Sequence, residues 1–316
     1  RLAWPVIRLR RAIRTIGHAD EAAAEVFACL DRTPGVGQIA GALALPGLAR
    51  EIRWEGVCIA GHGGRPLLAD LSLSIPAGSQ TALVASDCHA PLTMVGLFLR
   101  HKDPGAGRIL VDGTDLRSVT LRSLREQIAF AAADGMLFSG TIADNIRCGR
   151  TGLAQDLIDD TARRCEVYEA IKDLPEAFAT AVGPGGTNVA AATAFRIGLA
   201  RAIIGNPAVL IVQEPPEAVV EREAVAIDAA LQQVHIGRTL VVIPSRLATL
   251  RAADRVFLIH QGRLHAEGPL QEPGALPARV AAGAPLRRHL HRLGAPAQGL
   301  REVGGAGLPV GEALPR

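Results

Sequence analysis

The chain has 316 residues, enough for one large or two modest domains with a sizeable core. Hydrophobic residues make up 48% and charged residues 21%, as in ordinary globular proteins, and a net charge of +3 is too weak to indicate a nucleic acid or an anionic membrane as partner. The five cysteines are scattered and form no C-x-x-C pair, which predicts reduced thiols used in packing. No run of about 18 apolar residues occurs, so the sequence predicts no membrane-spanning segment. Because the chain opens on Arg1 rather than Met, we expect it to be a piece of a longer protein.

The first fifty residues predict a helix and a linker. Residues 5–30 carry apolar residues at helical spacing and end at the turn signal DRTPG. This pattern indicates either an exposed amphipathic helix or the cytoplasmic end of a helix that enters a membrane upstream. Residues 35–50 are rich in Gly, Ala and Pro, as is typical of a linker.

Strand and helix patterns alternate from Glu51 onward. The first strands, bounded by Gly and Pro turns, are EIRWEGVCI, ADLSLSI, QTALV and GRILVDG. Residues 140–175, 191–204 and 221–233 are predicted to be helical. The continuous apolar runs PAVLIVQEPP, RTLVVIP and DRVFLI are typical of parallel strands buried on both faces. This predicts an α/β fold with a helix-rich insert. After about Leu293 it predicts a tail that has few apolar side chains to bury.

The stretch LVASDCHAPLTMV, residues 83–95, lies between a predicted strand and a predicted helix. A phosphate-binding loop at such a place uses glycines, a lysine and a Ser or Thr that holds Mg²⁺. This stretch has neither glycine nor lysine. Pro91 supplies no cation and no backbone N–H, although it suits the first turn of a helix. Asp87 adds negative charge, and His89 is either the only candidate cation or an exposed loop histidine.

From about Glu51 to Gly268 the sequence resembles the ATP-binding cassette of an ABC exporter. The stretches that carry this resemblance, in the family's order, are GRPLLADLSLSIPAGSQTALV, DPGAGRILVDGTDLRSVTLRSLREQIAF, MLFSGTIADNI, RIGLARAIIGNPAVLI and ADRVFLIHQGRLHAEG. The resemblance implies a P-loop NTPase-like α/β fold with a mixed or parallel core sheet, an antiparallel β subdomain and a helical subdomain at about 140–200. It also implies that residues 1–50 follow an upstream transmembrane domain, that residues 51–268 form the cassette, and that residues 269–316 hold a C-terminal helix and a tail.

The resemblance assigns the positions that would contact a nucleotide, and most are degenerate. The phosphate-loop positions are Ala85, Ser86, Asp87, Cys88, His89, Ala90, Pro91, Leu92 and Thr93. The signature positions are Val189, Ala190, Ala191, Ala192 and Thr193. The base-stacking aromatic is replaced by Gly61, and the switch histidine by Ser245.

The metal and catalytic positions follow from the same resemblance. No metal is expected, because the positions that would hold or sense Mg²⁺ are Leu92, Ala133 and Gln213. Glu214 retains the general-base position. With nothing left to hold Mg²⁺, we expect Glu214 to be an inactive, solvated carboxylate at a strand end. The D-loop positions are residues 217–220, and none of them matches the family except Ala218.

Two further segments bear on coupling to a transport domain. Residues 180–188, TAVGPGGTN, lack the charges usual before the signature. Residues 138–142, FSGTI, match the family. They are predicted either to dock on coupling helices or to pack locally and cap a helix.

These departures lie at positions that would touch ATP, whereas positions that build the sheet match the family. We therefore predict a non-hydrolysing cassette without a cofactor, the structural or regulatory half of an exporter-type complex at the cytoplasmic face of the plasma (inner) membrane. The expected partners are a transmembrane domain of the same or another chain and a second cassette, and no nucleic acid. Two alternatives stay open: an active or weakly active ABC ATPase that uses ATP and Mg²⁺, and a free-standing interaction module.

Overall fold

The computed structural model describes residues 3–31, 35–61, 63, 65–183, 188–215 and 221–269. It divides into two compact units, residues 1–37 and 38–316. The C-terminal helix and tail predicted for residues 269–316 lie outside the described residues, Pro269 excepted.

The first unit contains one long helix, α1 (Ala3–Leu30), which confirms the helix predicted over residues 5–30. Its described side chains are almost all exposed, and the Arg8 guanidinium lies 4.1 Å from the centre of the Trp4 ring. None of the described helices, α1 included, combines the length and hydropathy needed to cross a bilayer.

The second unit begins with an antiparallel sheet. Its strands, in spatial order, are β2 (Pro66–Pro76), β1 (Glu51–Ala60), β4 (Ala106–Val111) and β5 (Thr114–Asp115). Residues 52 and 54 of β1 and, after a shift in register, residues 57 and 59 face the core, as expected of a sheet with one solvated face. Among them Trp54 pairs with Leu73 and Ile109, and its ring packs edge to face on Phe98 of α2 (His89–Phe98), with centroids 5.0 Å apart.

A mainly parallel sheet forms the centre of the unit. Its strands, in spatial order, are β12 (Arg263–Gly268), β11 (Arg255–His260), β3 (Gln80–Ala85), β10 (Thr239–Ile243), β9 (Val209–Gln213) and β6 (Ile128–Ala131). Only the edge strand β12 runs antiparallel to its neighbour in this sheet. All six residues of β3 are buried, as are the first four of β9 and of β10, because helices cover both faces of the sheet. The predicted α/β fold, with its antiparallel subdomain, is confirmed.

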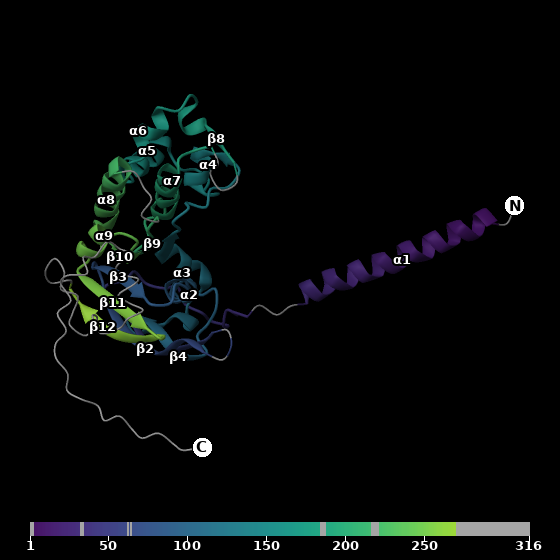
Figure 1. The fold of residues 1–316 in the computed structure, drawn as a ribbon, viewed down its shortest axis with the longest axis horizontal. Coiled ribbons are helices and arrows are strands. Elements are labelled where there is room, and N and C mark those ends of the chain that lie inside the picture. Colours follow the sequence, from purple (N-terminus) through teal and green to yellow (C-terminus); the bar gives the residue numbers. More distant parts are fainter. Residues whose placement is uncertain are drawn as a thin grey trace, which may run out of the picture. The chain divides into compact units, whose positions relative to one another are not determined.

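Helices surround this sheet and form a separate group at one end (Figure 1). The helices next to the sheet are α2, α3 (Leu121–Gln127), α7 (Ala191–Ile203), α8 (Glu221–His235) and α9 (Leu247–Arg251). The helical group contains α4 (Ile142–Arg147), α5 (Gln155–Arg164), α6 (Tyr168–Lys172) and the small hairpin of β7 (Gly140–Thr141) and β8 (Ala181–Val182). Figure 1 shows this group at one end of the unit and β2 and β4 at the other, with the core strands between them.

Helix α7, which also contacts α4 and α5 of the helical group, packs on the backbone after β6 through a close approach of two glycines. Gly135 has φ of +70°, and a Cβ built on Gly198 of α7 would lie 2.7 Å from the Gly135 carbonyl oxygen. Since no side chain fits at that separation, both positions need glycine, and α7 can pack directly on the backbone that follows β6.

Candidate functional site

The ends of three neighbouring parallel strands place several predicted site residues at one edge of the core sheet. β10 pairs with β3 on one side and with β9 on the other, and Ile243 lies opposite Gln213. The carboxyl ends of these strands therefore meet, bringing together the turn after Ala85, the residues after Gln213 and the loop that contains Ser245. This edge is where open α/β sheets bind ligands.

The turn after β3 uses its own acidic residue to bond the first backbone donors of α2. The Asp87 carboxylate accepts the His89 N–H at 2.8 Å, and the Asp87 carbonyl accepts the Ala90 N–H at 3.2 Å. The third residue of the helix, Pro91, has no N–H. The N–H groups that a helix start offers to an anion are therefore bonded internally or missing at these three positions.

The side chains of this turn face in different directions. Ala85, Ala90 and Pro91 are buried, whereas the Asp87, Cys88 and His89 side chains are exposed. Leu92, which the resemblance places at the position of the Mg²⁺-binding hydroxyl, is 44% exposed and offers no ligand atom. Ser86 is fixed from the other side: its N–H donates to the Ile259 carbonyl at 3.0 Å, and its Oγ lies 3.0 Å from His260 Nδ1.

Glu214 is buried, and the prediction of a solvated carboxylate was wrong. Its side chain is 0% exposed. The N–H groups of Ser245 and Arg246 donate to Oε2 at 2.7 and 3.0 Å, and Arg246 Nε donates to Oε1 at 2.7 Å. The Thr249 hydroxyl donates to Oε1 as well. Both oxygens of the carboxylate are therefore occupied by donors from the loop after β10 and from α9.

Arg246 is the residue that sequence reasoning missed. Its guanidinium also donates to the Ala224 carbonyl at 3.2 Å and to the Asp228 carboxylate at 2.5 Å, both on α8. Burial lowers the pKa of Arg246, but the charges of Glu214 and Asp228 and their hydrogen bonds outweigh it and raise the pKa above the ordinary value. The arrangement is a closed ion-pair network that joins β9, α8 and α9.

The residues predicted to occupy the metal-sensing and base-stacking positions offer few groups that could contact a nucleotide. Gln213 ends β9 half-buried, and Ala133, half-buried in the turn after β6, has no polar side-chain atom. Gly61 follows β1 and donates its N–H to the Arg65 carbonyl at 3.0 Å. A Cβ at Gly61 would lie 2.5 Å from that same oxygen, so an aromatic side chain does not fit there without a backbone shift.

The predicted signature residues, 189–193, form the start of α7. Val189 packs against a core cluster that includes residues of the helical group and of the core sheet, Ala192 is buried, and Ala190 at the N-cap makes no side-chain capping bond. The phosphate-loop positions Ala85 and Ala90 belong to a different core cluster. The D-loop positions 217–220 and residues 184–187 of the segment 180–188 lie outside the described residues.

Residues 138–142 have mainly local contacts. Thr141 caps α4 in a reciprocal capping box with Asp144, and Ile142 is fully buried. Phe138 is 41% exposed, with the Arg201 guanidinium 5.7 Å from its ring centre. Asn145, which sequence reasoning also missed, bonds both the N–H and the carbonyl of Phe138, at 3.0 and 2.9 Å.

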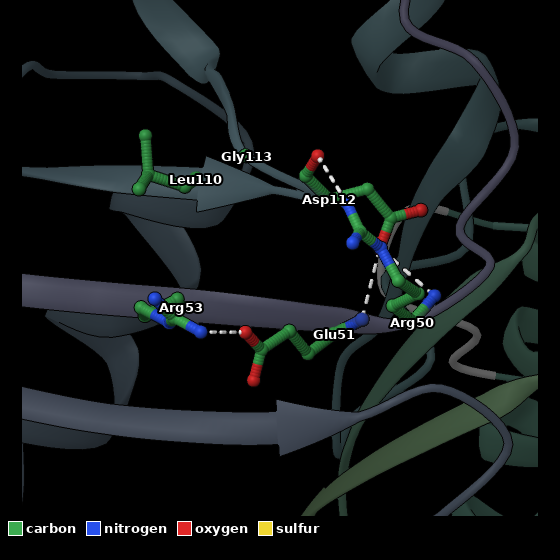
Figure 2. Close-up of a pocket in the computed structure, with 6 residues that line it drawn as sticks. All are labelled: Arg50, Glu51, Arg53, Leu110, Asp112 and Gly113. Atoms are coloured by element: carbon green, nitrogen blue, oxygen red, sulfur yellow. Dashed lines mark hydrogen bonds and ion pairs between the residues drawn. The ribbon is translucent and has the colours of Figure 1, made fainter.

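A pocket of about 220 Å³ lies away from these residues, at the start of β1 (Figure 2). Its lining residues are Arg50, Glu51, Arg53, Leu110, Asp112 and Gly113. The Asp112 carboxylate accepts the backbone N–H groups of Ala49, Arg50 and Glu51 at 2.7 to 2.9 Å. Glu51 and Arg53 form an ion pair, so the charged groups of this pocket bind one another and anchor the segment before β1.

Comparisons with known proteins identify the fold. The family model described as ABC transporter matches residues 68–217. An ATP-dependent lipid A-core flippase of Syntrophus aciditrophicus (strain SB) is 33% identical over 264 residues, which cover 84% of this chain and 44% of the flippase. A sophorolipid transporter of Starmerella bombicola is 36% identical over 210 residues, 65% of this chain and 16% of that transporter. The chain thus spans less than half the length of these relatives.

A solved structure gives the same result. The structure of a bacterial Atm1-family ABC exporter with ATP bound superimposes with a TM-score of 0.78 at 29% sequence identity, covering 94% of this chain and 51% of the exporter chain. Sequence and fold together show that this chain contains an ATP-binding cassette of the ABC transporter type, which includes residues 68–217.

Proposed function

We propose that this chain is the cassette of an exporter-type ABC protein that has lost ATP binding and hydrolysis and serves as the structural or regulatory half of a transport complex. The transmembrane domain would lie on the same or another chain and place the cassette at the cytoplasmic face of the plasma (inner) membrane, with residues 1–50 between the two. A second cassette would be its partner. The names of the relatives, a flippase and a transporter, support the transport context.

The turn between β3 and α2 carries this proposal. A triphosphate binds a phosphate loop through backbone N–H groups, a lysine cation and a Mg²⁺-bound hydroxyl. Here the Asp87 carboxylate accepts the His89 N–H, where an anion would otherwise bind. Pro91 removes the cation and one N–H, and Leu92 removes the hydroxyl. Mg-ATP does not fit this set of groups, and the added negative charge of Asp87 repels phosphate.

The magnitudes support a complete loss of useful affinity. Millimolar binding needs a free energy of only about −4 kcal/mol. A lost charge-assisted hydrogen bond costs about 1.5–3 kcal/mol, and a lost base–aromatic stack about 1–3 kcal/mol. The cation and the hydroxyl are absent, Gln213 replaces the family's aspartate, and Gly61 replaces its aromatic residue. The combined loss is larger than the binding free energy that a normal cassette could lose and still bind ATP.

The surroundings of Glu214 support the loss of hydrolysis. A general base needs an oxygen that can accept a proton from water. Both oxygens of Glu214 accept hydrogen bonds from Arg246, Ser245 or Thr249, and its side chain is fully buried. We infer that Glu214 here stabilises the fold.

A weakly active ATPase is the second candidate, favoured by one observation: Glu214 is retained on an intact core sheet. The deciding experiment titrates the 316-residue chain with labelled ATP and Mg²⁺ and measures phosphate release, alone and with any cassette that co-purifies. We expect no saturable binding up to about 1 mM ATP and no release above background. Saturable binding with turnover that disappears in a folded Glu214→Gln variant would establish the ATPase and overturn the proposal.

A further inference from the structure

Three consecutive side chains at the start of α2 carry metal-binding chemistry that the proposed function does not use. One donor atom each from Asp87, Cys88 and His89 lies within 4.8 Å of the other two, and all three residues are exposed. Within the described residues, no other group of three His, Cys, Asp or Glu side chains gathers its donors so closely.

The donor set selects one class of cation. A carboxylate oxygen, a thiolate sulfur and an imidazole nitrogen suit borderline-soft divalent ions such as Zn²⁺, whereas Mg²⁺ and Ca²⁺ take oxygen ligands. Three protein ligands with an open fourth position is a usual zinc arrangement. Bonds of about 2.0–2.3 Å in a tetrahedral site separate the ligand atoms by roughly 3.5 Å. Rotation of exposed side chains can supply the contraction from 4.8 Å.

The local backbone favours this use of the three residues. The hydrogen bonds from the His89 and Ala90 N–H groups to Asp87 hold the turn closed. Because the backbone is already ordered, metal binding would cost little conformational entropy. Cys88 occupies the N-cap position of α2, but its side chain makes no capping bond. The described residues provide no second hydrogen bond to the Asp87 carboxylate.

The charge balance also favours a cation over a phosphate at this place. Asp87 and a metal-bound Cys88 thiolate bring two negative charges, against about half a positive charge at the helix N-terminus. A lysine at position 91, as in the family's phosphate loop, would put an ammonium beside the metal. Pro91 carries no charge.

We propose that Asp87, Cys88 and His89 bind a divalent cation of the Zn²⁺ class, with water in the fourth position. This inference goes beyond the proposed loss of ATP binding and does not depend on it.

The test uses the full chain and Co²⁺ as a spectroscopic probe in buffer without nucleotide. We expect the visible bands of tetrahedral Co²⁺ and a near-ultraviolet thiolate-to-Co²⁺ band, both displaced by Zn²⁺ and unaffected by excess Mg²⁺. Cys88→Ser is expected to abolish the thiolate band, and His89→Asn to weaken Co²⁺ binding by at least about tenfold. Cys148→Ser, which changes another exposed cysteine, is the matched control and should leave both bands intact.

Two outcomes would overturn the proposal: absence of the thiolate band in the unmodified chain, or a band that survives Cys88→Ser and disappears in Cys148→Ser. Because no nucleotide is present, either outcome leaves the ATP titration to decide the proposed function separately.

Discussion

Arg246 binds both oxygens of Glu214: its backbone N–H lies 3.0 Å from Oε2, and its Nε lies 2.7 Å from Oε1. The two residues come from different strand ends, β9 and β10, and the same guanidinium continues to Asp228 on α8. The carboxylate that the resemblance assigns to the general-base position is therefore part of a buried ion pair that joins the core sheet to two helices.

Removing Glu214 is expected to destabilise the fold. Glu214→Ala leaves Arg246 buried, with its side chain 10% exposed, and paired only with the half-buried Asp228. Breaking one partner of a buried pair costs about 3–5 kcal/mol. Urea unfolding followed by circular dichroism measures this loss.

The matched control is Glu126→Gln, which breaks the exposed pair of Arg122 and Glu126, whose side chains are 89% and 60% exposed. That change should cost less than about 0.5 kcal/mol. Equal losses for the two variants would contradict a stabilising role for Glu214.

The sequence allowed the strands and the position of the site to be predicted, because those depend on local patterns. The buried runs of β3, β9 and β10 are continuous and apolar. The sequence segments on either side of them resemble those of a family in which the order of the segments is known. The environment of Glu214 depends instead on Arg246, 32 residues away. A strand-end carboxylate gives no local signal that a distant arginine will cover it.

Exposure of the cysteines was misjudged for a similar reason. All five are free, as predicted, but Cys29, Cys88 and Cys148 are exposed and only Cys165 is fully buried. Apolar neighbours in sequence do not determine which side of a short helix or turn faces the core. For Cys88, that exposure is what makes a metal site available.

Asp112 is predicted to anchor the segment before β1 to the end of β4. Asp112→Ala removes the acceptor of the Ala49, Arg50 and Glu51 N–H groups, at a cost of about 2 kcal/mol, because hydrogen bonds to charged groups contribute about 1.5–3 kcal/mol. Hydrogen exchange should show lost protection of these three amides. Asp160→Asn, in an exposed pair with Arg163, is the control and should leave their exchange unchanged.

The same anchor is expected to weaken in acid. Burial raises the pKa of Asp112, but the backbone donors outweigh it and hold the pKa below its ordinary 3.8. A lowered pKa in the folded state means that this contribution is present above 3.8 and is lost as the pH falls through the folded-state value. Amide protection at residues 49–51 that increases on acidification would contradict this assignment.

Cys165 is predicted to make stability fall in alkali. Burial raises the pKa of its thiol from 9.0 to about 12. Between these pH values the thiol of the unfolded chain has lost its proton, whereas that of the folded chain keeps it. The stability present below pH 9.0 therefore declines as the pH rises, by up to about 1.4 kcal/mol per pH unit.

Unfolding measured from pH 8 to 11 should give a shallower decline for Cys165→Ala than for the unmodified chain. Cys148→Ser should retain the steep decline, and identical slopes in all three proteins would contradict the prediction.

Restoring the phosphate loop should restore nucleotide affinity if its lost groups are the cause. Pro91→Lys returns a cation and a backbone N–H, and Leu92→Ser returns the hydroxyl. Each charge-assisted hydrogen bond contributes about 1.5–3 kcal/mol, roughly a 10- to 150-fold gain in affinity. Labelled Mg-ATP titration of the double variant is therefore expected to show binding that the unmodified chain lacks.

Pro91→Ala separates the two effects of the lysine, because it returns the N–H without the charge and should gain far less. A Pro91→Ala chain that binds as well as the double variant, or a double variant that still fails to bind, would contradict the proposal that the missing cation and hydroxyl abolish ATP binding.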